Sequence, residues 1–254
     1  MPGAEKKKAF GIILTWNSAH LVEGIYNRIP KEYFDEIILS DDGSTDDTMA
    51  VAQKLGIKCF THEHSGYGGN IKYGLQKALE LGAEYMVEIH GDGQYDPSFT
   101  PRALKMMREG TDFLLGSRFT DIRQPLRDSM PLSRYLANIG MSFVDRLVLQ
   151  MPLTEFHTGF RVYSRTLLET VDLTHTSNDH LFSFQIITLA RYCNLRIREL
   201  AIRCDYSKEH SSISIKRSVV YALQTFGMLG YYILARLGIR SKVFKNQPRE
   251  SVSR

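Results

Sequence analysis

The chain has 254 residues, 43% of them hydrophobic and 24% charged, which suits one large α/β domain or two small ones and excludes disorder and a multi-spanning membrane protein. The net charge of +4 suits an anionic substrate or anionic lipid and is too small to indicate nucleic acid. Cys59, Cys193 and Cys204 lack CxxC spacing, which disfavours disulfides and structural zinc and indicates a reducing compartment. No apolar run as long as that of a signal peptide precedes Trp16, so we expect a cytoplasmic protein.

Short apolar runs predict five β-strands in the first half of the chain, at residues 10–15, 36–40, 58–61, 85–90 and 113–117. Helical spacing predicts helices from Ser18, over 44–55, over 70–81 and near 101–108. Ser44 and Asp47 are expected to cap the second of these helices. Strands that alternate with helices imply right-handed crossovers, so the fold class is α/β with a mainly parallel sheet flanked by helices.

Polar residues follow the ends of four of the predicted strands. These are the segments 15–17 (Thr-Trp-Asn), 41–42 (Asp-Asp), 90–94 and 116–118 (Gly-Ser-Arg). The carboxyl ends of parallel strands lie at one edge of the sheet, where ligands bind in open α/β folds. We therefore expect these segments to be neighbours in space and to form an active site.

The segment after the fourth strand carries His90, Asp92 and Gln94 at every second position, so an extended chain projects them to one side. Gly91 and Gly93 between them let a ligand approach the main chain closely. Three possible ligands would then converge.

Two further segments indicate a nucleotide site. The second acid of the Asp41-Asp42 pair exceeds what helix capping needs, and a carboxylate at a strand end can accept hydrogen bonds from a base or ribose. Gly66 and Gly68 belong to a glycine-rich segment, 65–70, that is similar to a phosphate cradle. The third glycine of GxGxxG and a P-loop lysine are missing, which disfavours a dinucleotide site.

Six segments occur in an order that resembles family-2 glycosyltransferases of the polyprenyl-phosphate (dolichol-phosphate) sugar synthase type. They are LTWN, DDGSTDD, GYGGNIKYGL, GDGQYDP, GSRF and TGFRVYSR, and the resemblance covers about residues 9–214. It implies a GT-A-type, Rossmann-like fold, a nucleotide-diphosphate sugar donor, a divalent cation (Mn or Mg) and inversion at the anomeric carbon.

The resemblance also implies roles for individual residues. It places Thr15, Trp16, Asn17 and Asp42 at the nucleotide and His90, Asp92 and Gln94 on the metal motif. Asp41, Gly66 and Gly68 are expected at the nucleotide from their place in the two segments described above. Arg118 and Arg134 are expected near phosphate groups. Thr158, Gly159, Phe160 and Arg161 match the family's Ser/Thr-Gly-Phe-Arg segment. The residues expected at the acceptor or its phosphate are Thr158, Gly159, Arg161, Lys208, His210 and Ser211.

Three positions depart from the family pattern. Thr15 replaces a proline, Glu155 an aspartate before the Gly-Phe-Arg segment, and His90 the first aspartate of the metal motif. Imidazole suits Mn, Fe or Zn better than Mg, which prefers oxygen ligands. Either His90 is an unusual ligand or Asp92 does most of the binding.

The expected reaction needs stabilisation of the leaving diphosphate, which a metal at Asp92 and the charge of Arg118 would supply. A phosphate acceptor is already ionised, whereas a sugar hydroxyl needs a base. Asp179 and His180 are the candidates for that base. Transfer to a saccharide or glycolipid hydroxyl thus remains an alternative to a polyprenyl phosphate. A nucleotide-sugar-binding relic, in which His90 impairs metal binding, is another.

Residues 219–235 carry no charge and are flanked by Lys216, Arg217, Arg236 and Arg240. Spanning a bilayer takes about 20 apolar residues, so this shorter run predicts a helix that does not span. It would pack on the catalytic domain, on a partner copy in a homodimer, or in the inner face of the membrane. We therefore divide the chain into a catalytic domain, 1–213, and a C-terminal helix with a basic tail, 214–254.

Overall fold

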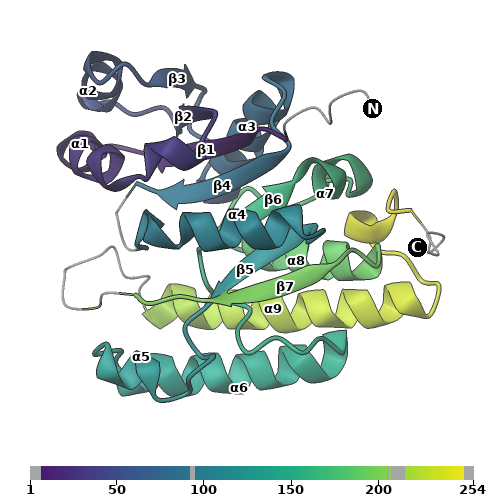
Figure 1. The fold of residues 1–254 in the computed structure, drawn as a ribbon. Helices are drawn as coiled ribbons and strands as arrows, with labels where there is room; N and C mark the ends of the chain where they lie inside the picture. Colours follow the sequence, from purple (N-terminus) through teal and green to yellow (C-terminus); the bar gives the residue numbers. More distant parts are fainter. Residues whose placement is uncertain (1–6, 92–94, 205, 207–214, 249–254) are drawn as a thin grey trace.

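The computed structural model describes residues 7–91, 95–204, 206 and 215–248, and within them one sheet of seven strands forms the centre of the molecule (Figure 1). The strands are β1 (Ala9–Thr15), β2 (Glu36–Asp41), β3 (Lys58–Thr61), β4 (Tyr85–His90), β5 (Phe113–Ser117), β6 (Arg161–Ser164) and β7 (Ile197–Ala201). Their order is β3-β2-β1-β4-β6-β5-β7, and β6 runs antiparallel to both of its neighbours while the other pairs are parallel.

The five predicted strands and the mainly parallel sheet are confirmed, while β6 and β7 were not predicted. Strand β6 has only four residues, and two of them are polar although all four are buried. Strand β7 lies at the edge of the sheet, and its charged residues interrupt the apolar pattern. Neither strand therefore has the continuous apolar run that identifies the central strands.

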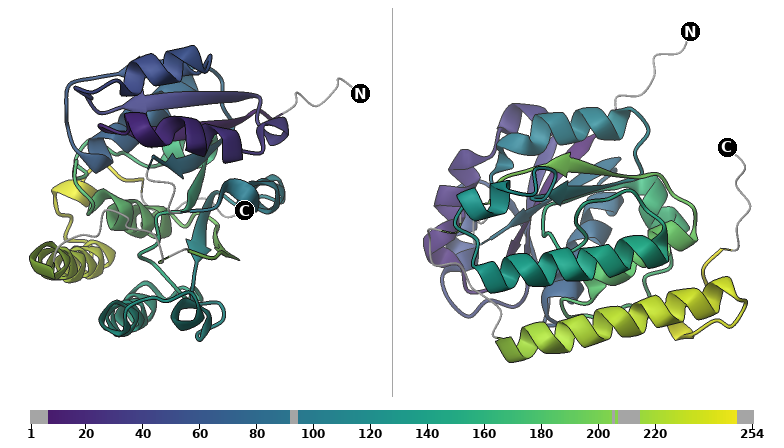
Figure 2. Two further views of the ribbon diagram at one scale, coloured as in Figure 1. Left: turned by 90° about the vertical axis from the view of Figure 1, so that its left-hand side faces the viewer. Right: turned by 90° about the horizontal axis from the view of Figure 1, so that it is seen from below.

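Helices cover both faces of the sheet (Figure 2). They are α1 (Ala19–Arg28), α2 (Thr48–Lys54), α3 (Tyr67–Glu80), α4 (Thr100–Arg108), α5 (Gln124–Arg127), α6 (Leu132–Leu149), α7 (Arg165–Thr170), α8 (Phe182–Tyr192) and α9 (Ile215–Arg236), with 3-10 turns at Lys31–Tyr33, Pro97–Phe99 and Lys242–Phe244. The four predicted helices are confirmed as α1 to α4. The predicted cap of α2 is wrong, because Ser44 hydrogen-bonds to Asp41 and the helix begins at Thr48.

Two hydrophobic clusters lie on opposite faces of the sheet, as the alternation of β1 requires. Phe10, Ile12 and Leu14 face one cluster, which α3, α8 and α9 complete. Ala9 and Ile13 face the other cluster, which α1 and α4 cover. Both faces of the central strands are therefore covered by apolar side chains, and most polar side chains lie at the ends of the strands.

The C-terminal helix α9 packs along the domain next to α6 and α8 (Figure 1). Met228, Leu229 and Tyr232 on one side of α9 join the hydrophobic cluster of the sheet. The chain then turns back so that Phe244 is buried against the rings of Tyr192 and Tyr232.

Candidate active site

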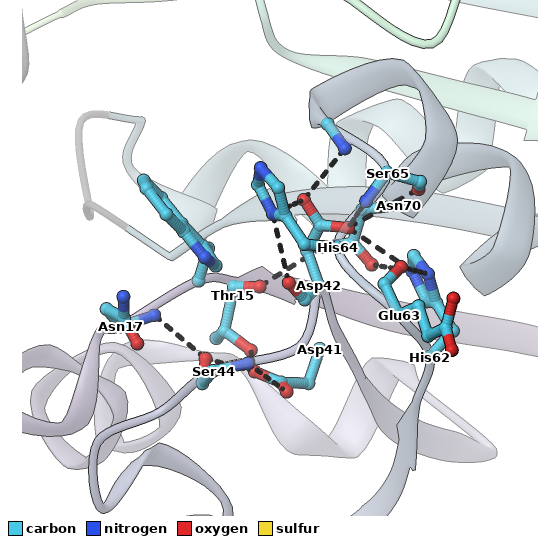
Figure 3. A network of polar contacts seen from close by, with 12 residues as sticks. Thr15, Asn17, Asp41, Asp42, Ser44, His62, Glu63, His64, Ser65 and Asn70 are labelled. Carbon is cyan, nitrogen blue, oxygen red and sulfur yellow. Dashed lines mark hydrogen bonds and ion pairs between the residues drawn. The ribbon is translucent and has the colours of Figure 1, made fainter.

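Three of the four predicted polar segments meet at the carboxyl edge of the sheet. The pairing register places Thr15 opposite Asp41 and Leu14 opposite His90, because β1 lies between β2 and β4. Figure 3 shows Thr15, Asn17, Asp41 and Asp42 gathered in one polar network. The predicted convergence of these strand ends is therefore present.

The carboxylate of Asp41 is buried and holds the turn that follows β2. It accepts hydrogen bonds from the Thr15 hydroxyl at 3.2 Å, the Ser44 amide at 2.9 Å and the Thr61 hydroxyl at 3.1 Å. Each of these partners belongs to the protein. Asp41 thus holds β1, β3 and the turn after β2 together through these hydrogen bonds. A direct contact of Asp41 with the nucleotide stays a prediction.

The carboxylate of Asp42 holds the loop between β3 and α3. It accepts from the amides of Ser65 and Gly66 at 2.8 and 3.0 Å, and it lies 2.9 Å from Nδ1 of His64 (Figure 3). The amides of Gly68 and Gly69 donate to the carbonyl of Asn178. The amides of Gly66 and Gly68 are thus engaged within the protein, and nucleotide binding at these two glycines stays a prediction.

Close packing explains why residue 68 is glycine. A Cβ atom there would lie 2.6 Å from Cβ of Phe182 and 2.8 Å from the carbonyl oxygen of Asp179. The glycine-rich segment therefore brings the start of α3 against residues 177–182. That contact carries Asp179 and His180 to the same end of the molecule as His90.

Two histidines that sequence analysis did not single out also line this edge. The ring of His64 stacks on the exposed ring of Trp16, with centroids 4.9 Å apart and planes 28° apart. His62 lies 3.3 Å from the side-chain oxygen of Asn70. Both follow β3 at alternate positions, so the argument used for His90 would have found them.

His90 is anchored from beneath by a buried carboxylate. Its Nε2 lies 3.0 Å from Oε1 of Glu88 and 2.9 Å from the carbonyl oxygen of Gly159. Two acceptors at one nitrogen require that Nε2 carries the proton, so in the neutral ring the lone pair is on Nδ1. Glu88, a lone acid inside the apolar run of β4, was the signal that sequence analysis passed over.

The carboxylate of Glu88 is charged although it is buried. Burial alone would raise the pKa of Glu88, but the hydrogen bond and charge of His90, the charge of Arg161 and a hydrogen bond from Tyr163 together lower it. The Tyr67 hydroxyl also donates to it at 2.9 Å. A buried charge needs such partners.

Arg161 and Thr158, predicted at the acceptor or a phosphate, are buried in this structure. The guanidinium of Arg161 donates to the carbonyl oxygens of Ser183 at 2.6 Å and Thr158 at 3.0 Å. A direct contact of Arg161 with the acceptor or a phosphate stays a prediction. Gly159 lies nearer the site, because its carbonyl meets His90 and its amide donates to the Tyr95 hydroxyl.

Arg118 and Arg134 come together around the ring of Tyr206. Arg118 is buried and forms an ion pair with Glu155, and it donates to the Tyr206 hydroxyl at 2.6 Å. The guanidinium of Arg134 lies over the Tyr206 ring, 5.8 Å from its centroid. Burial opposes the charge of Arg118, but the carboxylate of Glu155 more than compensates and raises the pKa of Arg118. Glu155, the departure from the family pattern, is thus the counter-ion of Arg118.

The remaining candidates divide between the site and the part of the chain that is not described. Asp179 is exposed, and the ring of His180 lies 4.8 Å from that of Tyr67, whose other neighbour is His90 at 5.8 Å. Burial lowers the pKa of His180. Predicted site residues outside the described residues are Asp92, Gln94, Lys208, His210 and Ser211.

Residues 12–172 match the family model of glycosyl transferase family 2. The chain belongs to glycosyltransferase family 2. It is 26% identical over 251 residues to UDP-N-acetylglucosamine–dolichyl-phosphate N-acetylglucosaminyltransferase of Methanococcus voltae, covering 91% of this chain and 95% of that protein. It is 24% identical over 245 residues to polyprenol monophosphomannose synthase of Mycolicibacterium smegmatis, covering 90% of each chain.

Solved structures confirm the GT-A-type fold of this glycosyltransferase. Glucosyl-3-phosphoglycerate synthase from Mycobacterium tuberculosis, in complex with Mn²⁺, UDP and phosphoglyceric acid, superposes with a TM-score of 0.65 at 17% identity. The match covers 93% of this chain and 81% of that one. The same enzyme has been crystallised with Mg²⁺ and UDP, with a TM-score of 0.65.

The residues around His90 in this glycosyltransferase fit a divalent cation in one respect. Metal-bound histidines usually donate their second ring N–H to a carboxylate or carbonyl, which is what Nε2 of His90 does. Within the described part of the chain, no group of three or more His, Cys, Asp or Glu side chains is placed to hold a metal. Asp92 and Gln94, the other two residues of the predicted metal motif, lie outside the described residues, so their part in a metal site stays a prediction.

Proposed function

We propose that this glycosyltransferase moves a sugar from a nucleotide-diphosphate sugar to a polyprenyl phosphate, with inversion at the anomeric carbon. The observation that carries the proposal is the match with relatives named for this reaction along nine-tenths of both chains. The polar strand ends that meet at the carboxyl edge of the sheet support the proposal, because they would form the donor site that the reaction needs.

The donor nucleotide would lie at the Trp16–His64 stack. An exposed indole backed by an imidazole offers a flat face to a base, and stacking on an aromatic side chain is worth about 1–3 kcal/mol. The carboxylate of Asp42 fixes His64 and the adjoining loop, so it would position the base site. Asn17 supports the same edge, since its side chain accepts from the amide of Thr45.

Asp92 and Gln94 would hold a divalent cation, with Nδ1 of His90 as the third donor. When bound, the cation supplies positive charge that stabilises the leaving diphosphate. Arg134 would add to that charge. Arg118 would hold Tyr206 and Glu155 in place, because its own charge is already compensated by Glu155.

The test is Asp92→Asn, which should abolish transfer of labelled sugar to polyprenyl phosphate while leaving the melting temperature unchanged. A loop carboxylate contributes charge to the site and little to the core. Asp96→Asn is the matched control, since Asp96 lies in the same loop and caps the turn at Ser98. Full transfer by Asp92→Asn would overturn the assignment.

A second candidate, transfer to a sugar hydroxyl, has one observation in its favour. His180 is partly buried with a lowered pKa, so its ring is neutral at neutral pH and can accept a proton. Asp179 precedes it in the sequence and is exposed. Transfer to a soluble saccharide that is lost in Asp179→Asn and His180→Gln, with no transfer to polyprenyl phosphate, would favour this candidate.

A further inference from the structure

Helix α6 carries its apolar stripe on the outside. Leu132, Leu136, Phe143 and Leu147 are 56–62% exposed and recur at spacings of about one or two turns, so they share one face. The polar Ser142 and Asp145 of the same helix are buried. A helix on the surface of a globular protein normally has the reverse arrangement, so the outer stripe needs another explanation.

Helix α9 is apolar on both of its faces. Its inner side chains, including Met228 and Leu229, are buried in the core, as described above. Its outer side also carries large apolar residues, and Leu223, Phe226 and Leu234 are all exposed. A helix that is apolar all round is normally covered all round, by protein or by lipid.

The two helices lie side by side on one side of the molecule. Helices α6 and α9 contact each other, and the view from below in Figure 2 shows them running along the same side. Within the described residues, the large exposed hydrophobic side chains lie between 122 and 239, apart from Trp16 and Tyr33. We call the outer faces of α6 and α9 the α6–α9 surface.

Charge decides what covers the α6–α9 surface. Residues 215–248 contain six lysines and arginines and no acid, and the acid of α6, Asp145, is buried. Two copies joined through this surface would bring like charges together, whereas anionic headgroups complement them. We propose that the α6–α9 surface docks on an anionic lipid bilayer.

The helices would lie in the plane of the bilayer. By length and composition alone, Arg217–Arg236 could cross a membrane. To stand across a bilayer, α9 would have to withdraw Met228, Leu229 and Tyr232 from the core cluster. With α9 lying flat, those residues stay packed while Leu223 and Leu234 enter the headgroup boundary.

Flotation of the full chain on a density gradient tests this surface. The chain should float with vesicles of phosphatidylglycerol and phosphatidylcholine and far less with phosphatidylcholine alone. The double variants Leu136→Glu/Phe143→Glu on α6 and Leu223→Glu/Leu234→Glu on α9 should each weaken flotation by roughly tenfold or more, since each removes two apolar side chains from the lipid contact. Tyr33→Glu, a change at an exposed apolar residue elsewhere on the protein, should leave flotation unaltered.

Three results would overturn the proposal that the α6–α9 surface docks on an anionic bilayer. They are failure of the full chain to float with anionic vesicles, flotation of both double variants like the parent, and a dimer in light scattering that the double variants dissociate without any lipid binding. The variants change exposed positions, and circular dichroism confirms that they fold. Because the surface is separate from the proposed transfer, both variants should still glycosylate a short-chain, water-soluble polyprenyl phosphate. If the unaltered chain does not glycosylate the short-chain polyprenyl phosphate, the proposed transfer function is wrong. The flotation result would still test membrane docking.

Discussion

Asp41 and Asp42 adjoin in sequence, yet their carboxylates have different partners. Asp41 binds hydroxyls and an amide around its own turn, whereas Asp42 reaches across to the loop that precedes α3. Alternation along an extended chain explains the difference, because successive side chains point to opposite sides. The sequence predicts that both acids lie at the site, but it does not reveal which distant loop each one holds.

Asp42→Ala should lower both stability and donor affinity. The change leaves the amides of Ser65 and Gly66 without their acceptor, at a cost of about 1–3 kcal/mol, and frees His64 from its place against Trp16. Thermal unfolding measures the first effect and calorimetric titration with nucleotide sugars the second. Asp47→Ala, at an exposed acid that makes no cap bond, is the control. Unchanged affinity for every donor would remove Asp42 from the nucleotide site.

His90→Asp should destabilise the fold even though it restores the residue usual in the family. A second carboxylate beside Glu88 replaces the N–H that Glu88 and the carbonyl of Gly159 now accept from. Losing a partner of a buried charge costs about 1–3 kcal/mol or more. Denaturant unfolding measures the loss, and adding Glu88→Gln should recover part of it. If the two changes were strictly additive, Glu88 and His90 would not be coupled.

At the scale of elements, four of the five strands that sequence analysis finds, β1, β2, β4 and β5, contain short apolar runs, and only β3 lacks one. Strands β1, β2 and β4 are covered on both faces, so their sequences need few polar residues. Strand β6 contains Arg161, whose buried charge interacts with the carboxylate of Glu88. The local sequence around Arg161 does not predict this interaction, because Glu88 lies 73 positions earlier in the chain. The position of β6 between β4 and β5 depends on such distant contacts.

Helices α6 and α9 meet at a buried polar junction. His157 lies between them, with Nε2 at 2.8 Å from the Asp145 carboxylate and Nδ1 at 3.1 Å from the Tyr221 hydroxyl. Oδ1 of Asp145 has no hydrogen-bond partner among the described residues. Burial raises the pKa of Asp145, although the hydrogen bond and charge of His157 act in the opposite direction.

Asp145→Asn should therefore gain stability relative to the parent as the pH rises. A folded-state pKa above the unfolded value of about 3.9 means that the stability contributed by Asp145 is complete below that value and is lost as the pH rises through the folded pKa. Asparagine does not ionise and can still accept from His157. Melting temperatures of both proteins from pH 4 to pH 8 give the difference, with the exposed Asp47→Asn as the control. A difference that shrinks with pH would mean that the Asp145–His157 ion pair dominates.

On the scale of the whole molecule, the sequence separates residues 214–254 from the catalytic domain by composition, and the structure shows how the two parts are joined. The buried side of α9 and the turn at Phe244 belong to the same cluster as β1, α3 and α8. Hydropathy alone does not distinguish a helix that completes a core from one that leaves it. The inner face of α9 could be identified only once its neighbours were known.

A chain ending at residue 213 should consequently fail to reach the stability of the full chain. Met228, Leu229, Tyr232 and Phe244 are each at most 5% exposed, and their removal uncovers α8 and Tyr192. Burial of one such side chain contributes about 1.5–3 kcal/mol, so four contribute about 6–12 kcal/mol. The total stability of a domain is about 5–15 kcal/mol. Circular dichroism and size-exclusion chromatography should show an aggregated or partly unfolded chain.

Exposed-face changes such as Leu223→Glu/Leu234→Glu should not reproduce this loss, because they leave the inner face of α9 in place. A monomeric 1–213 chain with the melting temperature of the full protein would mean that α9 adds nothing to the core.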